Sequence, residues 1–139
     1  MGIGTSRRVA RRERSALVVL GVVVLGSGLA LKYLAPPAIR ASVGGVPYVA
    51  LWAIIFRFAS LRVPPYACAL AAFLLTCALE ILQLWHPSWL EAIRGYTLGA
   101  LVLGTSFDWA DFPAYAVGAV VAGLLLVVVE RRARLGDAA

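Results

Sequence analysis

Five polar side chains in the second half of the chain have types and spacings that suit chemistry. Glu80 and Gln83 lie three residues apart within an apolar segment, so a helix would place them on one face. Arg94, Asp108 and Asp111 follow in the segment after it. A carboxyl group, an amide and an arginine gathered there could bind a polar head group, with Arg94 contacting an anion, or Glu80 could transfer protons.

A structural hypothesis competes with this chemical one. A carboxylate within a membrane-spanning helix costs roughly a few kcal/mol, so it needs a partner. Glu80 would pair with Arg94 and so fasten the segment between them, and we favour this hypothesis. For Asp111, which precedes Phe112 and Pro113, we favour a helix N-cap over a role in binding.

Other catalytic signatures are absent from the sequence. It contains no phosphate-binding loop and no G-x-S-x-G, H-E-x-x-H or C-x-x-C motif. His86 is the single histidine, and Cys68 and Cys77 lie too far apart on a helix for a disulfide. We therefore expect no metal and no cofactor, and a non-enzymatic protein is favoured without being decided.

Four apolar segments must position these side chains. The chain is 62% hydrophobic and 14% charged, whereas soluble domains carry about 25% charged residues. Each segment is long enough to cross a hydrocarbon core of roughly 30 Å as a helix, and prolines lie at the joints. The sequence predicts an all-α polytopic membrane protein with a transmembrane domain over residues 16–130. Its spans are about 16–34, 45–61, 66–85 and 112–129.

The distribution of basic residues predicts the orientation. The tail 1–15 has five arginines, and further arginines lie between the second and third spans and in the tail 131–139. Only Lys32, Arg40 and Arg94 lie on the other side. The positive-inside rule places both tails in the cytoplasm. We expect Arg57 to extend to the cytoplasmic surface, as long basic side chains do near helix ends.

The positions of the basic residues along the chain also indicate which binding partners to expect. The basic residues lie at the ends of apolar segments rather than in a patch, which argues against nucleic acid. The expected partners are membrane lipids, and either a second membrane protein or another copy of this chain. In the last span, Ala114, Gly118 and Ala122 have a spacing that permits close helix contact.

The segment between the third and fourth spans is predicted to be a short re-entrant or interfacial element. Ser88 and Glu91 fit a capping box that starts a short helix, which Gly95 would end. Residues 98–104 are too few to span a membrane and too apolar for a free loop. An interfacial aromatic belt is expected on this side. Its members are Trp85, Trp89, Tyr96 and Trp109.

Several of these residues carry a resemblance. The pattern Glu80-x-x-Gln83-Leu84-Trp85, followed by Leu98-Gly99 and by Asp111-x-x-x-Tyr115-x-x-Gly118, resembles an uncharacterised bacterial family of small integral membrane proteins, distantly VanZ-like. The resemblance covers about residues 45–130 and implies a four-helix membrane fold with no established reaction. It also implies a multi-pass protein of the bacterial cytoplasmic (inner) membrane. Members carry Gly-Asp where this chain has Tyr48-Val49, so no activity that needs that aspartate is implied.

Three hypotheses for function follow, from different classes. The favoured one is a non-catalytic accessory or envelope-associated membrane protein, which needs only apolar helices and a shaped outer surface. The second is an enzyme or binder that acts on a lipid-linked substrate at the outer leaflet. The third is a small transporter, which would have to be an oligomer because four helices form a poor conduit alone.

Overall fold

The computed structural model describes the backbone of residues 2–136 and the side chains of 7–39 and 43–136. Over this range the chain forms seven helices and no strand. The helices are α1 (Gly2–Leu34), α2 (Pro37–Val43), α3 (Gly45–Ala59), α4 (Pro65–Leu82), α5 (Ser88–Arg94), α6 (Thr97–Leu103) and α7 (Asp111–Leu135). The all-α prediction is therefore confirmed for the part of the chain that is described.

The basic tail and the first apolar segment lie on one continuous helix. α1 begins at Gly2 rather than at Ala16 and runs for 33 residues. The tail contains no proline, and arginine is a good helix former, so nothing ends the helix at the change of composition. α7 likewise continues through Arg131 to Leu135. Residues 137–139 of the predicted C-terminal tail lie outside the described residues.

Three helices, not four, are long and apolar enough to cross a membrane. They are α1 from Arg7 onward, α4 and α7. α3 is apolar but has only 15 residues, about 22 Å at about 1.5 Å per residue. It ends at Ala59 because Ser60 is extended and Pro64 and Pro65 follow, whereas we expected the second span to reach 61.

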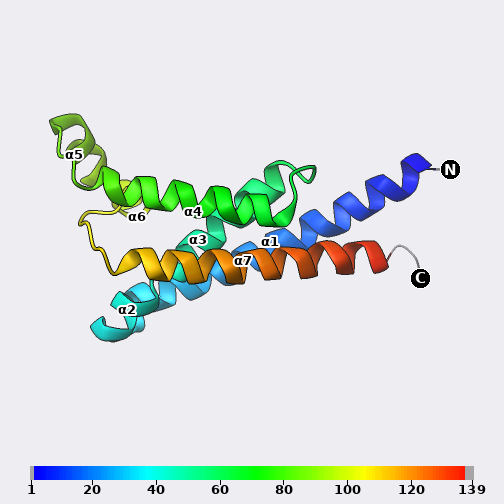
Figure 1. Cartoon of the computed structure of the whole chain (residues 1–139), viewed down its shortest axis with the longest axis horizontal. Helices are drawn as coiled ribbons and strands as arrows, with labels where there is room; N and C mark the ends of the chain where they lie inside the picture. The colour runs from blue at the N-terminus through cyan, green and yellow to red at the C-terminus, as the bar shows by residue number, and fades with distance from the viewer. Residues whose placement is uncertain (1, 137–139) are drawn as a thin grey trace.

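The four longest helices form a bundle with both chain ends at one end of it (Figure 1). α3 contacts α1, α4 and α7, and α7 also contacts α1 and α4. α5, α6 and the chain that joins α6 to α7 lie at the opposite end from the termini (Figure 1). α3 and α7 are therefore the central pair, and α1 and α4 flank them.

Small residues on α7 allow this central pair to approach closely. Ala114, Gly118 and Ala122 are buried. A Cβ atom added to Gly118 would lie 3.0 Å from the Cα atom and the carbonyl oxygen of Val46. The predicted close helix contact is confirmed, and its partner is α3.

Candidate functional site

Glu80 is the centre of a buried cluster at the end of the bundle away from the termini. It lies on the inward face of α4, and only 1% of its surface is exposed. Its Oε1 atom accepts a hydrogen bond from the backbone N–H of Asp108 at 2.7 Å. Its Oε2 atom accepts one from Gln83 Nε2 at 3.0 Å and one from Tyr115 Oη at 2.6 Å. Glu80 thus joins α4, α7 and the chain between α6 and α7.

The predicted ion pair between Glu80 and Arg94 is wrong. Arg94 is 5% exposed, and it donates to the carbonyl oxygens of Trp85 at 3.1 Å and Leu82 at 3.0 Å. Its Nη1 atom also pairs with Glu91 at 2.6 Å. The guanidinium therefore binds one carbonyl at the last residue of α4 and one in the turn that follows it. Since neutral donors already satisfy Glu80, it needs no cation from α5.

Both predicted N-caps are also wrong. α5 begins at Ser88 itself, with Pro87 before it and no side-chain cap. Glu91 instead contacts His86 Nδ1 at 3.0 Å. The hydrogen bond with His86, and then that with Arg94, lowers the pKa of Glu91. The residue that precedes the helix gives no side-chain cap because proline supplies no polar group.

At the start of α7, Asp111 does not cap the helix, and Asp108 forms the side-chain hydrogen bond of the preceding turn. Asp111 is the first residue of the helix, and Ala110 stands at the N-cap position without a side-chain cap bond. Asp108 Oδ1 accepts a hydrogen bond from the backbone N–H of Ala110 at 2.9 Å, in a turn just before the helix. Asp111 is thereby left at the wall of a cavity.

A cavity of about 570 Å³ lies beside Glu80, between α1, α3, α4, α6 and the chain that leads into α7. Its apolar wall includes Leu25, Leu51, Trp52 and Ile55. Leu25 and Ile55 are each 44% exposed, so the cavity opens on the outer surface between α1 and α3. Its polar lining includes Lys32, Tyr48, Glu80, Gln83, Asp108, Asp111 and Tyr115. Four of the five predicted site residues therefore line one cavity, and Arg94 does not.

α6 covers this cavity on the side away from the termini. Tyr48 Oη donates a hydrogen bond to the carbonyl oxygen of Val102, which ties α6 to α3. Gly104 ends α6 with φ of +69°, a conformation that favours glycine. A Cβ atom there would lie 2.5 Å from Gln83 Nε2, so the Gln83 amide packs directly against this turn. The re-entrant depth of α6 in a membrane stays a prediction.

The four predicted interfacial aromatic residues are all more than half exposed. Trp85 and Trp89 lie edge to face with ring centroids 5.5 Å apart, and Trp109 stacks on Phe112 at the same separation. Large exposed aromatic rings near α5 and the start of α7 are typical of a membrane interface. Their contact with lipid remains a prediction.

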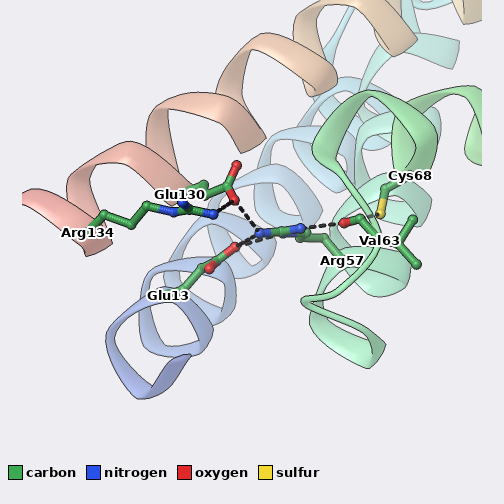
Figure 2. A network of polar contacts seen from close by, with 6 residues as sticks. All are labelled: Glu13, Arg57, Val63, Cys68, Glu130 and Arg134. Atoms are coloured by element: carbon green, nitrogen blue, oxygen red, sulfur yellow. Dashed lines mark hydrogen bonds and ion pairs between the residues drawn. The ribbon is translucent and has the colours of Figure 1, made fainter. Parts of the chain in front are cut away.

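A second buried cluster lies at the end of the bundle that carries the termini, and sequence analysis missed it (Figure 2). Arg57 is 2% exposed, so the prediction that it extends to the cytoplasmic surface is wrong. Its Nη2 atom lies 2.5 Å from Glu13 Oε1 and 3.3 Å from Glu130 Oε1, and its Nη1 atom donates to the carbonyl oxygen of Val63. Arg57 stays inside because α1 and α7 both present a carboxylate to it. Glu13 and Glu130 each stand beside arginines near a chain end, which was the available signal.

Within the described part of the chain, no group of three or more His, Cys, Asp or Glu residues could hold a metal ion.

Comparison with known proteins gives a family and no structural relative. No solved structure matches the chain. Residues 34–119, more than half of the chain, match the model of the family described as "Protein of unknown function (DUF2809)", and the matched range includes Glu80, Gln83 and Tyr115. The chain belongs to this family.

Proposed function

We propose that this chain is a bacterial inner-membrane protein that binds the polar end of an amphipathic molecule in the Glu80 cavity without transforming it. Four helices would cross the membrane, with both termini in the cytoplasm and the cavity toward the outer leaflet. The observation that carries the proposal is a cavity with an apolar wall and a polar end that opens on the side of an apolar bundle. The described resemblance to VanZ-like proteins agrees with a bacterial membrane.

The fourth crossing is assigned to α3, despite its length. α3 is enclosed by α1, α4 and α7, so little of its surface would face lipid. Its Arg57 is satisfied within the bundle, which removes the cost of a charge near the helix end. With α3 counted, the chain crosses four times, which agrees with both termini lying at one end of the bundle (Figure 1).

The charges around the cavity favour particular ligands. Three carboxylate side chains and one lysine line it, and no arginine does. The hypothesis of an anionic head group relied on Arg94, which instead binds the end of α4. A ligand end that donates hydrogen bonds, such as an ammonium or a hydroxyl group, therefore suits the cavity better than a phosphate.

The hydrogen bonds of Glu80 favour binding over catalysis. Three donors at 2.6–3.0 Å already take three of the roughly four lone-pair positions of its two oxygen atoms. A general base must have a lone pair directed at the proton that it removes. Glu80 is better described as the group that fixes Tyr115 and the chain at Asp108 around the cavity.

The test compares probes that share a tail and differ in the polar end. Dodecylammonium, dodecanol and dodecyl phosphate would be titrated calorimetrically into the full chain in one detergent. We expect the ammonium probe to bind tightest and the phosphate weakest. Leu51→Trp should fill the cavity and weaken binding at least about tenfold, which is about 1.4 kcal/mol. Leu70→Trp, at a position that is 57% exposed and outside the cavity lining, is the matched control.

Two results would contradict the proposal. Equal affinity for all three probes in both tryptophan variants would show partition into the micelle rather than a site. Turnover of a probe that depends on Glu80 would replace a binder with an enzyme.

The orientation is tested separately by labelling single introduced cysteines in intact bacteria with a membrane-impermeant maleimide. Ser88→Cys should react and Leu135→Cys should not. The reverse pattern would invert the proposed topology and leave the cavity proposal to be judged by the titrations.

A further inference from the structure

A basic groove lies at the end of the bundle that carries the termini, far from the Glu80 cavity along α1. It has a volume of about 430 Å³ and lies between α1 and the last turn of α3. Arg7, Arg11 and Arg14 line it at intervals of four and three residues, which places them on one face of α1. The rest of the lining is Ala10, Ser15, Val18 and Phe58.

The groove has three cations and no acidic residue in its lining. Glu13, the acid that lies among these arginines in the sequence, turns into the bundle and pairs with Arg57 (Figure 2). α1 therefore separates its charges, with the carboxylate inside and the three guanidinium groups outside. A groove of this kind is complementary to an anion.

The buried ion pair also holds the two walls of the groove together. Glu13 and Arg57 are the sequence neighbours of Arg14 and Phe58, so the bridge between them fixes α1 against α3 at this point. The Arg14 guanidinium carbon lies 5.6 Å from the centre of the Phe58 ring, within the range of a cation–π interaction. The ion pair and the cation–π contact thus hold α1 and α3 together beside the groove.

An exposed apolar stripe continues from the arginines along the same face of α1. Val18, Val22 and Leu25 follow Arg14 at intervals of four, four and three residues, and they are 53%, 66% and 44% exposed. A charged half followed by an apolar half matches the head group and the acyl chain of a phospholipid. A free phosphate or a nucleic acid would need the arginines but not the apolar stripe.

We infer that this groove binds an anionic phospholipid of the leaflet on the side of the termini. Its phosphate contacts Arg7, Arg11 and Arg14, and one acyl chain lies along Val18 and Val22. Basic pockets beside membrane helices are suited to such head groups because the surface of that leaflet is negative. The inference rests on the proposed membrane placement and does not depend on a ligand in the Glu80 cavity.

The test measures lipid binding to the full chain in detergent by native mass spectrometry. Phosphatidylglycerol and phosphatidylcholine with the same acyl chains would be titrated against the wild type and two variants. Arg11→Gln with Arg14→Gln should weaken phosphatidylglycerol binding at least about tenfold, because it removes two of the three cations that line the groove and contact the phosphate. Arg131→Gln with Arg132→Gln removes the same charge from exposed positions on α7 outside the groove lining, where no contact with the bound phosphate is lost, and should change the affinity less than about twofold.

Three outcomes would overturn the inference. They are equal loss in both double variants, equal affinity for the two lipids in the wild type, and displacement of the lipid by inorganic phosphate at the same concentration. A chain that stays monomeric in water without detergent would instead refute the membrane placement itself. The two failures are therefore distinguishable.

Discussion

The Arg57 and Glu80 clusters lie at opposite ends of one bundle and differ in the partners that they give to a buried charged side chain. Each has a charged side chain that is no more than 2% exposed, with partners on α7 and on another segment. Arg57 faces the carboxylates of Glu13 and Glu130, so opposite charges compensate each other there. The three hydrogen-bond donors to Glu80 are all neutral groups.

A difference in surrounding space accompanies this difference in partners. The Glu80 cluster forms one wall of a cavity of about 570 Å³. Arg57 is enclosed between α1, α3, α7 and the turn at Val63 (Figure 2). The comparison teaches that burial of a charge does not by itself mark a binding site. A buried carboxyl group that lines a cavity is the better candidate.

The largest effect is expected from Arg57→Met. It removes the cation and leaves Glu13 buried without it, and loss of one partner of a buried pair costs about 3–5 kcal/mol. Unfolding of the detergent-solubilised chain by heat or denaturant would measure the loss. Arg62→Gln, which removes an exposed arginine five residues away, is the control and should change stability by less than about 0.5 kcal/mol.

If Arg57→Met were as stable as the wild type, the Arg57 cluster would not hold α1, α3 and α7 together, and the contrast between the two clusters would be lost. A double variant at Glu13 and Arg57 separates the effect of the unpaired charge on stability from the effect of lost packing. Glu13→Gln with Arg57→Met should recover part of the lost stability, since no unpaired charge remains between α1 and α3.

The two clusters also differ in how far sequence alone could predict them. Glu80 was found because a carboxylate in an apolar segment is conspicuous, and Gln83 because it lies one turn further along the same helix. Tyr115 is 35 residues away, and the sequence could not pair it with Glu80 until α4 and α7 were placed side by side. The nearer cation, Arg94, was a plausible partner by charge but binds backbone carbonyls instead.

Arg57 was missed for a related reason. A basic residue near the end of a single helix is expected to extend to the surface, and that expectation ignores neighbouring helices. The acids that hold it inside are Glu13, in the predicted N-terminal tail, and Glu130, the last residue of the predicted transmembrane domain. Three of the four predicted spans correspond to helices that are long and apolar enough to cross a membrane. Helix ends depend on prolines and tertiary contacts, so α1 begins before residue 16 and α3 ends at Ala59.

The next effect in size is expected from Tyr115→Phe. It removes the hydroxyl that donates to Glu80 at 2.6 Å, and a hydrogen bond to a charged group contributes about 1.5–3 kcal/mol. Tyr66→Phe, where the ring is 72% exposed, is the matched control. Denaturant unfolding in detergent measures the stability, and equal changes in the two variants would show that the Tyr115 hydroxyl makes no special contribution.

A smaller signal is expected from a double-mutant cycle between Glu80→Ala and Arg94→Ala. Since the two side chains have different partners, their effects on unfolding free energy should add to within about 0.5 kcal/mol. The cycle of Glu80→Ala with Tyr115→Phe should deviate from additivity by more than this. If the first cycle showed the larger coupling, Arg94 would belong to the Glu80 cluster after all.

The smallest effect concerns Glu91, which is exposed and lies outside the membrane-spanning segments. Hydrogen bonds from His86 and then Arg94 lower its pKa in the folded state below that of the unfolded chain. Its contribution to stability is therefore present above the unfolded pKa, about 4.3, and is lost as the pH falls through the lower folded value.

The melting temperature of the wild type should exceed that of Glu91→Gln slightly at pH 7, and the two melting temperatures should converge in acid. The difference at pH 7 should also shrink in about 1 M salt, because exposed charges are screened. A difference that grew as the pH fell would mean that Glu91 is stabilised in its protonated form, and the proposed contact with His86 and Arg94 would be wrong.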